Sequence, residues 1–156
     1  MAIPKRKLTE EQAQEILRSC QYGVLSTVDE QGNPYGVGIN CFYVEEEHAL
    51  YFHTKKTGKK MNNIKKHPQV SVFITDGKEQ IVQERFTTHY QSILVEGCAE
   101  MIENIDEIEA KLRLLCQRLC PDAVDRREEV IAKSLSIVGI CRISIKKITA
   151  KANRDA

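Results

Sequence analysis

The sequence lacks any long apolar run and any strong net charge. Of its 156 residues, 42% are hydrophobic and 29% are charged, and its 23 basic residues nearly balance its 22 acidic ones. No stretch approaches the roughly 20 apolar residues that a membrane-spanning helix needs. A net charge of +1 gives no overall field to attract nucleic acid or a membrane surface. We therefore expect a soluble globular protein with neither nucleic-acid nor membrane partners.

Signals for export and for metal binding are also missing. The opening Met-Ala-Ile-Pro-Lys-Arg-Lys turns polar at once, without the apolar segment of a signal peptide. The six cysteines include no CxxC pair, so we expect free thiols, a reducing compartment and a cytoplasmic protein whose residues 1–156 form one domain. Cys116 and Cys120 are spaced for one helix face. Without further ligands, we interpret them as small core residues and expect no metal site.

Apolar periodicity divides the chain into helices and strands. Thr9 and Gln12 fit a capping box that opens an amphipathic helix over roughly 9–21. Strand patterns are found at 23–28, 35–44, 48–54, 69–75, 89–102 and 139–147. Further helical patterns lie at 58–66, 105–119 and 124–135, the segment 76–87 is expected to be the longest loop, and the tail after Ala150 is expected to fray.

The connections between the first strands are too short for parallel crossovers, so the sheet is expected to be antiparallel. Helices at the margins of such a sheet define an α+β fold. Closure into a small barrel would remove the exposed edges that six strands otherwise leave. The expected fold is therefore mainly β, a six-stranded antiparallel barrel with flanking helices.

The segment Tyr51–Lys60, a strand that runs into a helix start, carries the strongest functional signal. Thr57 can N-cap the helix, and the free N–H groups of the first turn favour an anion there. Polar side chains from the strand end and the first turn are expected to face the same cleft, namely His53, Thr54, Lys59 and Lys60. The alternative is a basic helix face that only meets water.

Two familiar phosphate-binding motifs do not fit this segment. A P-loop needs Gly five residues before the Gly58-Lys59 pair, where His53 stands. A dinucleotide-binding fingerprint needs Gly three residues after Gly38, where Cys41 stands, and no helix follows. Both the mononucleotide P-loop and the Rossmann interpretation are therefore excluded.

Gly36 and Gly38 lie inside a predicted strand. Glycine weakens a strand and marks either the close approach of a ligand or a β-bulge, and the sequence leaves both interpretations open. A second polar segment, 88–92, opens the strand after the long loop, and its alternative is an exposed edge. A lone histidine such as His89 is more often structural than catalytic.

Taken together, these features resemble the FMN-binding split β-barrels of the pyridoxamine-phosphate-oxidase type. The resemblance rests on Leu25–Val28 with Gly32–Tyr35, on Leu50–Thr54 with Gly58–Lys60 and His67–Val70, and on Ser92–Gly97. Tyr-Phe-His at 51–53 and Tyr-Gln-Ser at 90–92 are closest to the subgroup related to nitroimidazole-resistance (Nim-type) proteins. Each motif is short, but their order and spacing extend over nearly the whole chain.

The resemblance implies a homodimer with FMN at the subunit interface. By analogy, four strand residues would lie along the flavin ring: Val37, Gly38, Ile39 and Asn40. His53 and Thr54 would contact the ring and ribityl region, and the phosphate would be held by Lys59 together with Lys60 and Thr57. Gln91 and Ser92 would approach the flavin from the interface.

The resulting functional hypothesis is an FMN-dependent reductase that passes electrons from NADH or NADPH to a small organic or nitroaromatic acceptor. His53 is the candidate catalytic residue, tuning the flavin or donating a proton; a structural histidine is the alternative. Other hypotheses are a non-enzymatic flavin-storage module and a related barrel that holds haem or a deazaflavin. The arginines that the oxidases use for the substrate phosphate have no match here, which argues against vitamin B6 oxidation.

Overall fold

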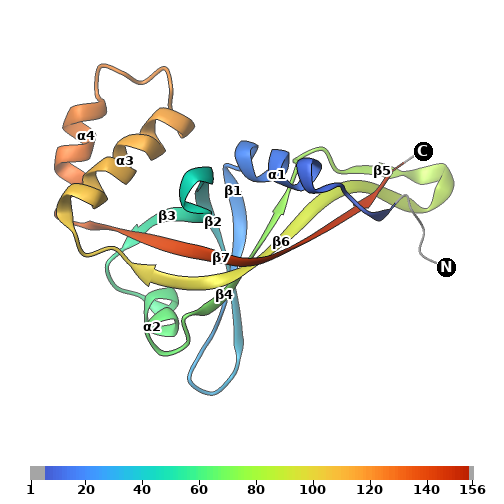
Figure 1. Ribbon diagram of the computed structural model, residues 1–156, viewed down its shortest axis with the longest axis horizontal. Coiled ribbons are helices and arrows are strands. Elements are labelled where there is room, and N and C mark those ends of the chain that lie inside the picture. Colours follow the sequence, from blue (N-terminus) through green and yellow to red (C-terminus); the bar gives the residue numbers. More distant parts are fainter. Residues whose placement is uncertain (1–5, 155–156) are drawn as a thin grey trace.

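The computed structural model describes residues 6–154, in which an antiparallel sheet rolls into a barrel with helices at its margins (Figure 1). The helices are α1 (Glu10–Ser19), α2 (Lys59–Lys66), α3 (Ile105–Leu119) and α4 (Arg127–Ser134). The strands are β1 (Tyr22–Val28), β2 (Pro34–Val44), β3 (Ala49–Lys55), β4 (Gln69–Thr75), β5 (Gln80–Val82), β6 (Thr87–Met101) and β7 (Val138–Asn153).

The strand order closes the barrel. Neighbouring strands run β4-β1-β2-β3-β7-β6, and a further pairing of β4 with β6 completes the ring. The expected six-stranded antiparallel barrel with flanking helices is thus confirmed. The short β5 is an addition, since it pairs with the outer part of β6.

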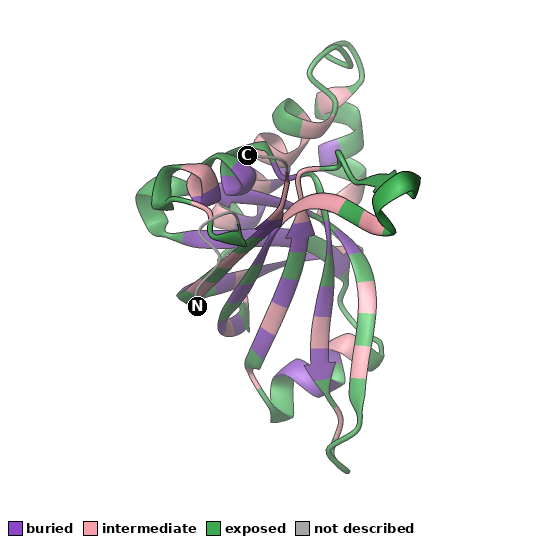
Figure 2. Ribbon diagram, turned by 90° about the vertical axis from the view of Figure 1, so that its right-hand side faces the viewer, coloured by how far each residue is buried: buried purple, intermediate pink, exposed green. Residues whose placement is uncertain are grey.

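Alternation along the strands builds the core. Figure 2 shows buried residues alternating with more exposed ones along the barrel strands. Inward side chains such as Leu25, Val72 and Ile93 are almost completely buried. A second cluster lies outside the barrel, where α3 and α4 cover Phe42 and Tyr51. Where α3 and α4 cover β2 and β3, these strands are buried on both faces, which explains why their sequences are continuously apolar at these positions.

Two helices lie at opposite ends of the barrel (Figure 1). The predicted capping box of α1 is confirmed: the Thr9 hydroxyl accepts from the Gln12 amide, while the Gln12 side chain accepts from the Thr9 amide. α1 lies near the end from which β5 and β6 project. At the other end, α2 buries Met61 and Ile64, and Asn63 Nδ2 donates to Thr27 Oγ1 at 3.0 Å.

Two local expectations are wrong. The segment 76–87 is not all loop, because it contains β5 and a 3-10 turn at Gln83–Arg85. The tail does not fray at Ala150, because β7 continues to Asn153, which pairs with Tyr90. Both pieces are strands with few buried neighbours, so their polar sequences lack the apolar alternation that reveals a strand. Among the described residues, no helix is long and apolar enough to cross a bilayer.

Candidate functional site

The start of α2 is arranged to receive a hydrogen-bond acceptor from outside the helix. The N-cap is Gly58, whose φ of 130° is a backbone conformation that residues with side chains rarely adopt, and no side chain caps the first turn. The expectation that Thr57 caps this helix is therefore wrong, because the helix begins one residue later. The Asn62 amide makes the first intrahelical bond to Gly58 O, which leaves the N–H groups before it for another partner.

Thr54, at the end of β3, carries a hydroxyl that lacks a partner. The residue is only 5% exposed, and its Oγ1 has no hydrogen-bond partner in the described part of the chain. A buried hydroxyl without a partner costs free energy, so such groups usually serve a ligand or a water. Thr54 also lines a cavity of about 500 Å³ between the end of β3 and the start of β7, together with His53 and Ile137.

The two lysines of the first turn face different neighbours. Lys59 Nζ lies 4.8 Å from the centre of the Tyr35 ring, on the side of the β1–β2 hairpin. Lys60 is half-buried and lies on the side of His53. Partial burial, with a smaller contribution from the Lys60 charge, lowers the pKa of His53 below its usual range. The structure therefore brings Lys60, rather than Lys59, into the electrostatic surroundings of His53.

The glycine-containing strand β2 presents its main chain outward. Val37 and Ile39 point into the barrel, whereas Gly36, Gly38 and Asn40 are exposed. A Cβ atom at Gly38 would lie 1.8 Å from the Tyr22 hydroxyl, while a Cβ atom at Gly36 would make an ordinary contact at 3.6 Å with Val24. Close approach at Gly38 is thus made by Tyr22, and Gly36 is the less crowded of the two glycines. Any ring that lies along β2 would meet backbone rather than the Val37 and Ile39 side chains.

Gln91 and Ser92 lie elsewhere, beside α1. Gln91 Nε2 donates to Asp76 Oδ2 at 3.3 Å, and Gln91 Oε1 accepts from Arg154 Nη1 at 3.2 Å. Arg154 also donates to Gln12 Oε1 at 3.2 Å, and these residues line a cavity of about 730 Å³. Sequence reasoning missed Arg154 because it assigned the tail to a frayed end.

Two groups of the predicted site residues lie far apart. Ser92 pairs with Thr75 at one end of β4, and Gln69 at the other end follows α2. The six steps from Gln69 to Thr75, at about 3.3 Å each, separate these ends by about 20 Å. One chain thus brings His53, Thr54 and Lys60 together but holds Gln91 and Ser92 at the opposite end of the barrel.

An exposed apolar row crosses the outer face of the barrel. Register pairs Gly38 with Val24, Val24 with Phe73 and Phe73 with Leu94, so these residues form one line over β2, β1, β4 and β6. Val24 is 40% exposed, Phe73 44% and Leu94 37%. We call this line the apolar row. Contiguous exposed apolar side chains of this kind are typical of a surface that another molecule covers.

The cysteines are free, as expected, but one expectation about them is wrong. Cys116 is half-buried and Cys120 is exposed at the end of α3, so Cys120 is not a core residue. The helix ends at Leu119, which leaves Cys120 at the C-cap with its side chain outside the packed face. Within residues 6–154, no group of His, Cys, Asp and Glu is placed to hold a metal ion.

The sequence matches a model of a known protein family. The family model described as pyridoxamine 5'-phosphate oxidase matches residues 9–152. No curated protein matches the chain.

Solved structures share the fold at low sequence identity. A conserved hypothetical protein from Mycobacterium tuberculosis has a TM-score of 0.80 and 17% identity, covering 99% of this chain and 91% of that chain. A candidate 5-nitroimidazole antibiotic resistance protein from Bacteroides thetaiotaomicron has a TM-score of 0.73 and 18% identity, with coverages of 96% and 90%. A flavocytochrome from Azotobacter vinelandii has a TM-score of 0.79 and 18% identity, with coverages of 97% and 70%.

Proposed function

The chain belongs to the pyridoxamine 5'-phosphate oxidase family, and from this membership we propose that it is an FMN-binding flavoprotein that reduces a small organic or nitroaromatic acceptor. Similar structures include an FAD- and haem-binding protein from Mycobacterium smegmatis and an F420 reductase, in addition to the flavocytochrome. Redox cofactors are thus a recurrent use of this fold. Free thiols at all six cysteines are compatible with the cytoplasmic location that we propose.

The observation that carries the proposal is the unpartnered Thr54 hydroxyl at the end of β3, the strand that leads into the uncapped start of α2. Both features supply hydrogen-bond donors that the described residues leave unused. A phosphate monoester offers several acceptor oxygens and a negative charge, which the helix dipole and a lysine stabilise. The residues present therefore fit the phosphate end of FMN.

We assign roles to the surrounding residues from their positions. The first-turn N–H groups of α2, with Lys60, would hold the phosphate, and Lys59 and Thr57 would contribute from the periphery. Thr54 would donate its hydroxyl to the phosphate or the adjoining ribityl chain. His53 would lie on the ring side, where a neutral imidazole can accept or donate a proton near the flavin. The flavin itself supplies the hydride and electron transfer.

A homodimer would complete this site. Gln91 and Ser92 lie about 20 Å along β4 from the α2 end, so they would reach the same flavin only from a second copy. The apolar row offers a self-complementary surface for such a pair, because a two-fold interface uses the same patch on both subunits. Each flavin would then have its phosphate on one chain and Gln91 with Ser92 on the other.

The cofactor is tested by the visible spectrum of the purified protein. FMN is expected to give flavin absorption bands and to be released on denaturation as the monophosphate. Haem or a deazaflavin would give different spectra, and either result would replace FMN as the cofactor while leaving the family unchanged.

Turnover is tested separately from binding. We expect the FMN-loaded protein to oxidise NADH or NADPH in the presence of a nitroaromatic or quinone acceptor. Tight FMN binding without any such turnover would support the alternative of a flavin-storage module.

A further inference from the structure

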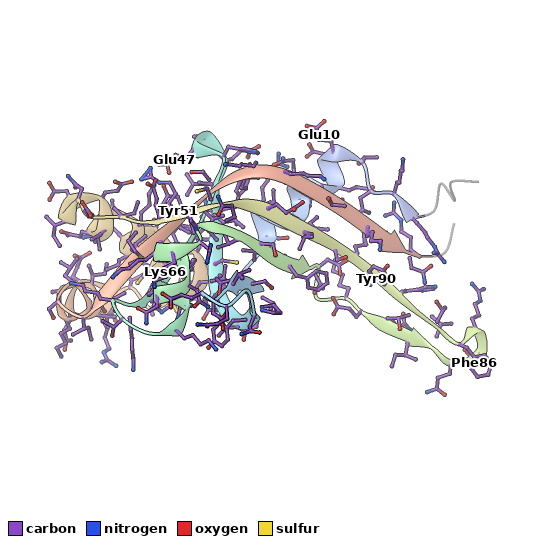
Figure 3. The ribbon with its side chains drawn as sticks, turned by 90° about the horizontal axis from the view of Figure 1, so that it is seen from below. Glu10, Glu47, Tyr51, Lys66, Phe86 and Tyr90 are labelled. Carbon is purple, nitrogen blue, oxygen red and sulfur yellow. The ribbon has the colours of Figure 1, made fainter. Side chains whose placement is uncertain are left out.

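An arm projects from the barrel and has no core of its own. It consists of β5, the following 3-10 turn and the first part of β6, and no residue from Thr75 to Gln91 is buried. Figure 3 shows Phe86 at the tip of this arm, far from Lys66 of α2 at the other end of the molecule. We call residues 76–90 the arm.

The tip of the arm carries one exposed aromatic side chain, on a residue with left-handed backbone conformation. Phe86 is 98% exposed and has a φ of 49°, a left-handed conformation that is rare for a bulky residue. Ile81, on β5, is 73% exposed. A large aromatic ring that is fully exposed at the tip of a projecting arm is typical of a side chain that another molecule receives.

Position identifies a second copy of the chain as that molecule. The arm is the continuation of β6, which also carries Leu94 of the apolar row, so both features belong to one continuous surface. If two barrels pack through their apolar rows, a two-fold axis across the strands brings the arm end of one copy to the α2 end of the other. This orientation is also the one that unites Gln91 with Lys60, so the inference rests on the dimer of the proposed function.

We propose that Phe86 of each copy covers the His53 cavity of the second copy and closes the flavin site from the ring side. That cavity has room for an aromatic side chain at about 500 Å³, and Ile137 on its wall is 66% exposed. The charges beside Phe86 are mixed, because Glu84 and Arg85 are both exposed, and only Glu84 is opposite in charge to the α2 end, which is rich in lysine. These lysines are Lys55, Lys56, Lys59, Lys60, Lys65 and Lys66. Phe86 is thus a positioning and shielding residue of its partner's site.

Photo-cross-linking from position 86 tests this contact. Phe86 is replaced by a benzophenone amino acid in the FMN-loaded protein, and isotopically labelled and unlabelled chains are mixed before illumination. The expected product joins the arm peptide of one chain to a peptide containing 53–57 or 136–138 of the other. The same probe at Val124, which is also exposed, is expected to give no such product.

The outcomes separate this inference from the proposed function. Cross-links within one chain, or between two arms, overturn the arm contact even if the protein is an FMN-binding dimer. A monomer in light scattering overturns both the dimer and the contact. In a second measurement, Phe86→Ala is expected to keep the dimer and bound FMN but to raise the quenching of flavin fluorescence by iodide, whereas unchanged quenching would contradict the shielding role.

Discussion

At the scale of single residues, two buried threonines have opposite hydrogen-bonding states. Thr27 is 1% exposed, and its hydroxyl accepts from Asn63 Nδ2. Thr54 is 5% exposed, and its hydroxyl has no partner among the described residues. The difference separates a hydroxyl that stabilises the fold from one that is available for a ligand.

The first prediction concerns Thr54→Val, which replaces the hydroxyl by a methyl group of similar size. We expect the ligand-free protein to gain about 1 kcal/mol in free energy of unfolding, because an unpartnered buried hydroxyl is removed. FMN affinity is expected to fall about tenfold, or about 1.4 kcal/mol. Urea denaturation and a flavin fluorescence titration measure the two effects.

Thr27→Val is the matched control for this experiment. It should cost about 1–3 kcal/mol of stability, because it leaves the buried Asn63 amide without its acceptor. If Thr54→Val destabilises the protein as much as Thr27→Val does, the Thr54 hydroxyl has a partner in the ligand-free protein and the fit to FMN loses its main support.

The second prediction compares the adjacent lysines. Lys60→Ala should weaken FMN binding by about 1.5–3 kcal/mol, about ten- to hundredfold, if it removes a charge-assisted phosphate contact. Lys59→Ala should have the smaller effect, because Lys59 lies over the Tyr35 ring. Equal affinities of the parent and of Lys60→Ala, measured by titration, would remove the phosphate assignment.

The third prediction concerns pH. The pKa of His53 is lowered, mainly by burial and also by Lys60. As the pH falls through the ordinary histidine pKa of about 6.5, the unfolded chain takes up a proton before the folded protein does. The free energy of unfolding therefore decreases as the pH decreases. The ligand-free parent should lose stability relative to His53→Gln between about pH 7.5 and pH 5 in urea titrations. A constant difference over this range would show that the His53 pKa is unshifted.

At the scale of elements, the start of α2 depends on one glycine. Gly58 has a φ of 130°, and a Cβ atom added there would meet nothing within 4 Å, so its requirement is for backbone conformation rather than for space. The helix that follows has only eight residues. Its first turn is therefore sensitive to the conformation of the residue that precedes it.

The fourth prediction is that Gly58→Ala costs about 1–3 kcal/mol in free energy of unfolding, because alanine is strained in this backbone region. FMN affinity should fall as well, since the first-turn N–H groups lose their orientation. The control is Gly36→Ala, where the nearest atom is 3.6 Å away and the backbone is ordinary. Thermal denaturation of both variants gives the comparison, and equal stabilities would contradict the conformational argument.

Most element boundaries were predictable from the sequence, and the failures share a cause. The capping box of α1 and the limits of β4 follow from local patterns, and the structure confirms both. β5 and the end of β7 were missed because their pairing with β6 leaves many side chains in water. The Thr57 cap was wrong because a glycine in an unusual conformation shifts the helix start by one residue.

At the scale of the whole molecule, the site is expected to need two chains. The fifth prediction is that the parent has about twice its 17.8 kDa chain mass in light scattering. Phe73→Glu should yield a folded monomer with weakened FMN binding, because a charge then stands in the middle of the apolar row. Val124→Glu, with 59% exposure at the parent residue, should leave the dimer intact. An FMN-binding monomer would refute the composite site.

The sequence alone determined most of the elements and the family, because capping, strand alternation and short motifs depend on neighbours within a few residues. It also placed a lysine-rich helix start after β3, since Gly58, Lys59 and Lys60 are adjacent in the chain. Only the tertiary structure shows which lysine lies near His53. It also shows that Arg154 donates a hydrogen bond to Gln91. Only the strand register put Gln91 and Lys60 at opposite ends of the barrel. These relations depend on contacts between residues far apart in the chain, which no local pattern encodes.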